Sequence, residues 1–164
     1  MAKPKNFQRP PMPPNLLDMA KLDALLCFAT YSTGRAFERL YRPFLSKIGL
    51  TYPQLLVMLA VWETGGLTMK ALTEQLMLES STLTPLVKKL EAAGLVKRSR
   101  NAKDERLLDI TPTKKGLSIR QEGCEAAYII ATSGGLTLEE LTALKEKLIH
   151  VRGALNEVAV KAAG

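Results

Sequence analysis

The residues most able to do chemistry are a cysteine and the tyrosines that follow it along the chain. Cys27 lies in the segment LLCFATYSTGRAFERLYRPF, and Tyr31, Tyr41 and Tyr52 all fall within 25 residues of it. A tyrosine O–H that donates to a thiolate favours the charged form, which is the nucleophilic form of cysteine. This set is compatible with a reactive thiol, whereas the commoner alternative for a helical cysteine is a small buried hydrophobe.

Helix geometry limits which tyrosine can reach the thiol. Tyr31 lies one turn from Cys27 on the same predicted helix and is the weaker candidate. Tyr41 lies 14 residues away, roughly 21 Å along a straight helix, so it reaches Cys27 only by chain reversal or from a partner subunit. Asp23, one turn before the thiol, has the wrong sign to activate it. The residues alone leave the reactive and the buried interpretations open.

Other kinds of chemical site find little support. His150 is the only histidine, and no cysteine or carboxylate cluster has ligand spacing, so we expect no metal site. Because the chain has neither a glycine-rich phosphate loop nor a Ser/His/Asp set, we expect no cofactor and no conventional enzyme. Trp62, in an apolar segment, is expected in the core.

The central part of the chain, from Leu67 to Thr113, predicts a winged helix-turn-helix. Apolar residues at helical spacing mark a first helix over Met69–Met77, and Ser80 is expected to cap a second helix that ends at Gly94. A polar tip then separates two extended segments that predict a β-hairpin, Leu95–Arg100 and Leu107–Thr111.

Hydroxyl and cationic side chains gather where this motif contacts DNA. Small residues at a helix N-terminus can approach base edges, and a basic hairpin suits phosphates and the electronegative minor groove. An alternative is a winged helix used for protein contacts, with solvated charges. The residues that favour DNA are Ser80, Ser81, Thr82, Thr84, Lys88 and Lys89 on the helix, and Lys97, Arg98, Arg100, Lys103 and Arg106 on the hairpin.

Composition fits a single DNA-binding domain. The net charge of +7 is concentrated in residues 79–120, which hold 10 basic and 5 acidic residues, whereas residues 121–164 hold 4 and 6. The chain shows no apolar run long enough to span a bilayer and no secretory signal, so we expect a cytoplasmic protein without a membrane partner. Two cysteines in such a chain argue against a disulfide framework.

The flanking segments predict a dimer built from both chain ends. Residues 1–14 are expected to form a flexible arm, and residues 15–164 a single domain with its winged part at about 51–112. The dimerisation region is placed at about 15–48 and 113–160. It comprises a helix from Asn15 toward Tyr41 with a break near Pro43, a helix over about 113–132, and a last helix with a coiled-coil-like seam. The expected fold class is mainly α with a small β-hairpin wing.

The chain resembles the MarR family of dimeric winged-helix repressors from about Leu22 onward, and specifically its OhrR-type sensors of organic hydroperoxides. The matching segments are LCFATYS around Cys27, LYRP with Tyr41, LTYPQ with Tyr52, STLTPLVKKLEAAGLVKRSR and DERLLDITPTKKG. This resemblance implies that Cys27 is the peroxidatic thiol and that Tyr41 and Tyr52 bond to it from the other subunit. It also implies release of a pseudo-palindromic double-stranded DNA operator once Cys27 is oxidised.

The resemblance also assigns the DNA contacts. Ser80, Ser81, Thr82, Pro85, Lys88 and Lys89 face the major groove and its phosphates, and Arg106, oriented by Asp104, enters the minor groove from the wing.

One departure concerns the second cysteine. Members with two cysteines carry a resolving cysteine near the start of the last helix, where this chain reads IIATSGGLT. Cys124 lies earlier, so it is either a resolving partner or a plain buried thiol, in which case a low-molecular-weight thiol caps Cys27. Two alternative functions are a repressor released by a small aromatic ligand, with Cys27 not a sensor, and a thiol peroxidase.

Overall fold

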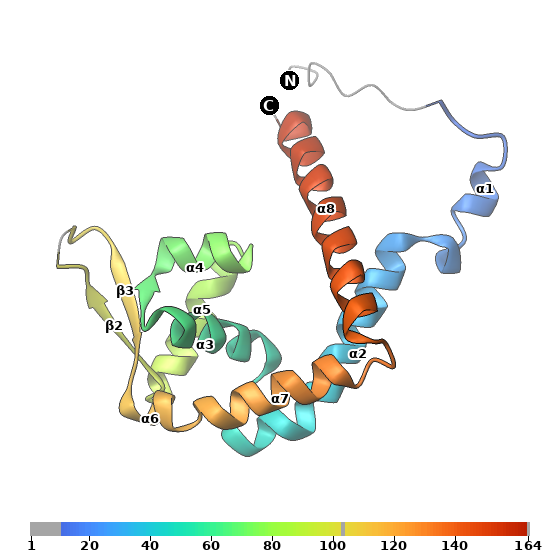
Figure 1. Ribbon diagram of the computed structural model, residues 1–164. Helices are drawn as coiled ribbons and strands as arrows, with labels where there is room; N and C mark the ends of the chain where they lie inside the picture. Colours follow the sequence, from blue (N-terminus) through green and yellow to red (C-terminus); the bar gives the residue numbers. More distant parts are fainter. Residues whose placement is uncertain (1–10, 103, 164) are drawn as a thin grey trace. The chain divides into compact units, whose positions relative to one another are not determined.

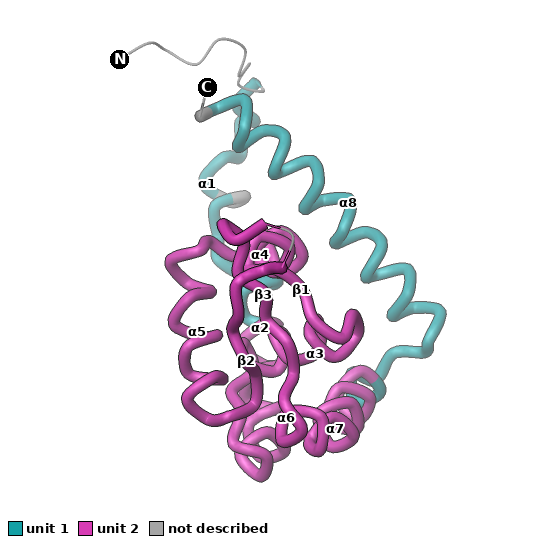
Figure 2. Tube along the Cα trace, turned by 90° about the vertical axis from the view of Figure 1, so that its left-hand side faces the viewer, with its two compact units in different colours: residues 1–32, 132–164 teal, residues 33–131 magenta. Residues whose placement is uncertain are grey.

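A computed structural model describes residues 11–102 and 104–163 (Figure 1). Most of the predicted arm, residues 1–10, and Lys103 at the wing tip therefore lie outside the described residues. The chain divides into two compact units, residues 33–131 and residues 1–32 with 132–164 (Figure 2). The elements are α1 (Leu16–Met19), η1 (Leu22–Ala24), α2 (Leu26–Leu45), η2 (Ser46–Ile48), α3 (Tyr52–Thr64), β1 (Leu67–Thr68), α4 (Met69–Leu76), α5 (Ser80–Ala92), β2 (Val96–Arg100), β3 (Leu108–Pro112), α6 (Lys114–Ser118), α7 (Arg120–Thr132) and α8 (Leu138–Ala163).

The unit of residues 33–131 contains the predicted winged helix-turn-helix. Helices α4 and α5 are followed by the hairpin β2–β3, in which Arg98 is paired with Ile110. The short strand β1, which the sequence did not predict, adds to the other edge of β3 and pairs Leu67 with Ile110. The result is a three-stranded antiparallel sheet of order β1-β3-β2, so the mainly α fold class with a small wing is confirmed.

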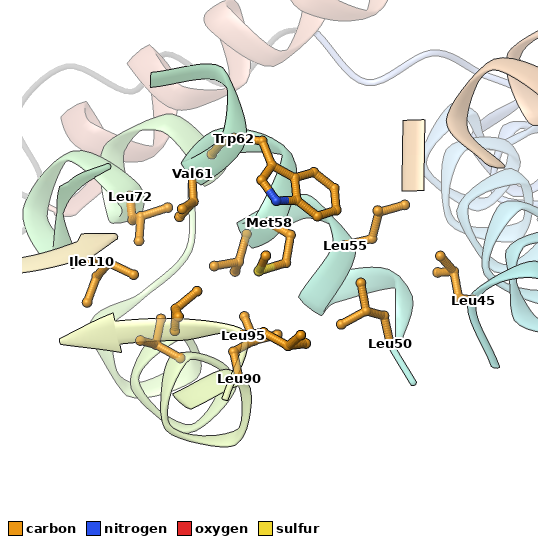
Figure 3. Close-up of a cluster of buried hydrophobic side chains, with 14 of the residues drawn as sticks. Leu45, Leu50, Leu55, Met58, Val61, Trp62, Leu72, Leu90, Leu95 and Ile110 are labelled. Carbon is orange, nitrogen blue, oxygen red and sulfur yellow. The ribbon is translucent and has the colours of Figure 1, made fainter. Parts of the chain in front are cut away.

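Helix α3 lies at the centre of the core. Its buried side chains include Leu55, Met58, Val61 and Trp62, which pack against residues of α5 and the sheet (Figure 3). Burial of a large apolar side chain stabilises a fold by roughly 1.5–3 kcal/mol. The indole Nε1 of Trp62 donates to the backbone oxygen of Gly116 at 2.9 Å, so this buried polar atom is satisfied. The prediction that Trp62 is a core residue is confirmed.

The helix starts and stops follow the sequence signals in most places. The Gln54 side chain accepts a hydrogen bond from the Thr51 backbone N–H at 2.8 Å, as part of the capping box that opens α3. Gly94 has a φ of +72°, the left-handed conformation that ends α5. Ser80 as a cap is wrong, because α5 already begins at Ser80 and Glu79 holds the cap position.

Three predicted helix boundaries are also wrong. The first helix is interrupted, since α1 and η1 precede α2 instead of one continuous helix. Helix α2 runs through Pro43 to Leu45, because buried Tyr41 and Leu45 anchor its last turn and outweigh the preference of the residue before proline for extended geometry. The helix expected over about 113–132 divides at Ile119 into α6 and α7.

The unit of residues 1–32 and 132–164 contains the long helix α8. Thr137 and Glu140 cap its start reciprocally, with the Thr137 N–H donating to the Glu140 carboxylate at 2.8 Å. The apolar seam of this helix is largely open in the single chain, and Leu155 is 63% exposed. The other exposed seam residues are Leu144, Leu148 and Val158.

Among the described residues, no single helix is long and apolar enough to cross a membrane. Residues 26–48 and 52–64 reach that length and composition only when taken together, and they are bent by 68°.

A substitution at Gly116 tests how tightly α6 packs onto the core. A Cβ added there would clash with the Leu95 carbonyl oxygen, which is fixed backbone. We expect Gly116→Ala to lower the free energy of unfolding by about 1–3 kcal/mol, the usual cost of overpacking. Gly153→Ala is the control, because nothing lies within 4 Å of a Cβ at that position of α8. Denaturant unfolding at one fixed protein concentration measures both, and an equal effect of the two substitutions would contradict the packing account.

Candidate functional site

Helix α5 exposes the face that was predicted to contact DNA. Leu83, Val87 and Leu90 are buried and fix the helix on the core. The opposite face carries exposed hydroxyls in its first turn and exposed ammonium groups one and two turns later. Among the predicted helix residues Thr84 is partly buried, and the exposed ones are Ser80, Ser81, Thr82, Pro85, Lys88 and Lys89.

The corner between α5 and the wing is held by an ion pair. Arg98 donates through Nε to the Glu91 carboxylate at 2.6 Å, and the Arg98 backbone N–H donates to the same carboxylate at 3.3 Å. These hydrogen bonds from Arg98 hold the pKa of Glu91 below its usual value. Both side chains are partly buried. Arg98, predicted as a DNA contact, therefore already has an anionic partner within the protein.

A network of short polar side chains shapes the tip of the wing. The Asn101 amide donates to both carboxylate oxygens of Asp109 at 2.9 Å, and its oxygen accepts from the Asp104 N–H at 3.1 Å. Asp104 in turn accepts from the Arg106 N–H at 3.1 Å, and its carboxylate lies 3.7 Å from the Arg106 guanidinium. The Arg106 side chain is 94% exposed. The tip thus presents Arg106 to solvent beside the carboxylate that was predicted to orient it.

A groove of about 390 Å³ lies between the two helices of the motif and the wing. The polar residues that line it include Thr73 on α4, Ser80 and Thr84 on α5, and Arg98 and Arg106 on the wing side. Arg100, also exposed, donates to the Glu105 backbone oxygen at 3.0 Å and so supports the wing tip. Of the predicted residues, Ser80 and Thr84 on the helix and Arg98 and Arg106 on the wing side therefore border one groove, and Lys103 lies outside the described residues.

The rings of Tyr41 and Tyr52 lie close together, tilted against each other, in the unit of residues 33–131. Their ring centroids lie 4.8 Å apart at an interplanar angle of 30°. Burial, and secondly the charge of Tyr52, raises the pKa of Tyr41 above 10.0, while burial and the charge of Glu38 raise the pKa of Tyr52. Both phenols are therefore protonated hydrogen-bond donors over the physiological pH range.

The two thiols are exposed in the single chain. Cys27 lies in the first turn of α2, where its backbone oxygen accepts from the Thr30 hydroxyl at 2.9 Å. Tyr31, one turn further on, is also exposed. Cys124 lies in α7, next to buried Gly123, with its own side chain exposed. Neither thiol is the buried hydrophobe that was the alternative interpretation of Cys27.

The sequence did not reveal the residues that hold the wing in place. Glu91, Asn101 and Asp109 were not predicted as site residues. Glu91 bonds to Arg98, and Asn101 bonds to Asp109 and to the Asp104 N–H. A signal existed for Asn101, because asparagine at a hairpin turn commonly bonds to nearby backbone. No spacing rule indicated Glu91, which pairs across a helix-to-strand corner.

Comparison with known proteins places this geometry among regulators. A family model described as "Transcriptional regulator SarA/Rot" matches residues 39–122. The HTH-type transcriptional regulator TtmR of Methylorubrum extorquens (strain PA1) is 42% identical over 139 residues, covering 85% of this chain and 71% of that protein. The organic hydroperoxide resistance transcriptional regulator of Bacillus subtilis (strain 168) is 36% identical over 143 residues, covering 87% and 97%.

A solved structure shows the same architecture with DNA. Reduced AbfR bound to DNA is 35% identical, with a TM-score of 0.70 over 85% of this chain and 97% of that one. AbfR, a protein of Staphylococcus epidermidis, has also been solved in a disulfide form, which is 36% identical with a TM-score of 0.59 over 86% and 96%.

The tyrosine pair generates a pH-dependent prediction. Because the folded-state pKa values are raised, the stability that the pair contributes is present below pH 10.0 and is lost as the pH rises through those values. Tyrosinate absorbance should show two residues that ionise only at higher pH. Tyr52→Phe should remove one of them and lower the pKa of Tyr41, whereas Glu38→Gln should lower the pKa of Tyr52. Ionisation of every tyrosine near pH 10 would contradict the burial of the pair.

Proposed function

The chain belongs to the MarR-like winged-helix family of SarA/Rot transcriptional regulators, and on this basis we propose that it is a peroxide-responsive repressor. As a homodimer it binds a pseudo-palindromic operator in double-stranded DNA and releases it when an organic hydroperoxide oxidises Cys27. A repressor of this kind works in the cytoplasm, where the DNA is. The observation that carries the proposal is the close pair of protonated tyrosines, buried Tyr41 and partly buried Tyr52, in a chain in which Cys27 is exposed.

The surface of α5 and the wing supports DNA binding. A helix that exposes Ser80, Ser81 and Thr82 in its first turn can place them against base edges in the major groove. Lys88 and Lys89 then lie where phosphates pass, and exposed Arg106 suits a narrow minor groove. The similarity to AbfR, which has been solved bound to DNA, supports the same use of this surface.

The open apolar seam of α8 supports a homodimer. A single winged helix reads few base pairs, whereas two related copies read two half-sites about one helical turn apart. Exposed leucines on α8, such as Leu148 and Leu155, would be covered by the partner. Burying such side chains stabilises an interface in the same way as a core.

The sensing step is a two-electron oxidation of the thiol. The Cys27 thiolate attacks the terminal peroxide oxygen, the O–O bond breaks, and the leaving alkoxide takes a proton to become an alcohol. The sulfur, now a sulfenic acid, then condenses with a second thiol to form a disulfide with loss of water. Tyr41 and Tyr52 of the partner hold the thiolate before this step, because helix geometry keeps Tyr41 far from Cys27 of its own α2. Loss of these hydrogen bonds shifts the dimer toward a form that does not bind DNA.

The substitution Cys27→Ser is the direct test of this function. Serine keeps a hydroxyl of similar size for the tyrosines. Before peroxide is added, the variant should therefore bind the operator with the affinity of the reduced wild-type protein. Serine does not form a sulfenic acid, so cumene hydroperoxide should no longer release the DNA. Operator binding measured with and without peroxide decides between the outcomes. A Cys27→Ser protein that still releases DNA on treatment would refute the sensor and favour a repressor released by a bound ligand.

The substitution Cys124→Ser tests which thiol resolves the oxidised sensor. If Cys124 resolves it, peroxide produces a protein disulfide on a non-reducing gel in the wild type and none in the variant. If a small thiol resolves it, the variant still releases DNA when a low-molecular-weight thiol is supplied with the peroxide. We expect the Cys124→Ser variant still to release DNA, because this chain lacks the resolving cysteine that two-cysteine members carry near the start of the last helix.

A further inference from the structure

The ion pair between α5 and the wing gives Arg98 a role different from that of the other wing cations. We propose that Glu91 and Arg98 are positioning residues that set the wing against the DNA-reading helix, and that Arg98 does not bind a phosphate. This inference rests on the proposed DNA-binding function. It goes beyond that function because it divides the basic residues of one surface into two classes.

Glu91 links α5 to both the backbone and the side chain of Arg98 in β2, and we call this link the brace. One carboxylate receives both the guanidinium of Arg98 and the backbone N–H of the same residue, at 2.6 Å and 3.3 Å. It therefore fixes a strand backbone, not only a side chain, to the last turns of α5. The backbone N–H of Arg98 lies in β2, whose neighbours across the hairpin lead directly to the wing tip. A movement of Glu91 would therefore be transmitted to the tip.

Exposure separates Arg98 from Arg106 on the same groove. Both arginines lie beside a carboxylate, but at different distances and exposures. The Arg98 side chain is 28% exposed and bonds to Glu91 at 2.6 Å, whereas the Arg106 side chain is 94% exposed and lies 3.7 Å from Asp104. A cation that is already neutralised releases few counterions when DNA approaches, whereas an exposed cation releases its share. The two arginines should therefore differ in how they affect the salt dependence of binding.

The salt dependence provides the first test. The probe is a duplex selected from a random-sequence pool by the reduced wild-type protein, and the dissociation constant is measured over a series of salt concentrations. Glu91→Gln combined with Arg98→Met removes the pair without changing net charge. We expect its affinity to fall about tenfold, the loss of one charge-assisted hydrogen bond. We expect the slope of log affinity against log salt to stay at the wild-type value.

Arg106→Met is the matched control, because it makes the same arginine-to-methionine change at the exposed site. Its slope should become shallower by about 2 for a dimer, since each lost contact removes about 0.9. A double variant whose slope falls as much as that of Arg106→Met would overturn the proposal, because Arg98 would then be a phosphate contact. An unchanged affinity in the double variant would overturn the positioning role.

Glu91→Asp provides the second test and keeps every charge. It only withdraws the carboxylate by one methylene, so a brace should loosen while long-range electrostatics stay the same. Amide hydrogen exchange without DNA should speed up about tenfold in β2 and β3 and stay unchanged in α3. Unchanged exchange in the wing would overturn the brace whether or not the protein binds DNA. A wild type that selects no duplex would refute the proposed function, and the exchange result would still decide the role of Glu91.

Discussion

The surface proposed to read DNA depends on a close backbone contact at the C-terminal end of α5. The start of α6 packs against the Leu95 carbonyl, and only a glycine fits at position 116. Around it, the Thr113 hydroxyl donates to the Gly94 oxygen at 2.6 Å and the Lys115 ammonium donates to the Ala93 oxygen at 2.8 Å. These bonds satisfy carbonyls that a helix end leaves unpaired, and a cation there also suits the helix dipole. The C-terminal end of α5 is thus fixed to the core, and its N-terminal end is free to face a ligand.

The same arrangement lets charge gather on one surface without destabilising the fold. Arg98 is neutralised by Glu91, and Asp104 lies beside Arg106, so a carboxylate offsets the charge of each of these two arginines. The tyrosine pair differs, because burial raises the pKa of both phenols above the usual value. One unit therefore combines an exposed ionic surface with a partly buried pair of hydrogen-bond donors, which are the two properties that the proposed repressor requires.

Local signals made much of this fold predictable, and non-local contacts made the rest unpredictable. The Thr51–Gln54 box and the left-handed Gly94 were readable because capping depends on residues three or four apart. Strand β1 was not, because two residues carry no periodicity and pair with β3 only after the chain has reversed twice. Pro43 was misjudged because buried Tyr41 and Leu45 outweigh a local preference.

The candidate site was also predictable where it depends on local spacing and unpredictable where it depends on contacts between elements. The exposed residues of α5 could be placed from helix spacing alone, since burial of Leu83, Val87 and Leu90 determines the opposite face. The contact of Tyr41 with Tyr52 requires the turn between α2 and α3, and no pattern in the sequence predicts how close the rings lie. Glu91 was missed for a similar reason, because its partner is in another element.

The free N-terminal turn of α5 also has a consequence for evolution. Ser80, Ser81 and Thr82 are exposed, and the cap position belongs to Glu79, so the fold does not depend on those three side chains. If these positions read the operator, one copy can accumulate substitutions there after a gene duplication and acquire a new target sequence, while its stability is inherited intact. Regulators of many different genes can descend from one such scaffold by changes confined to a single helical turn.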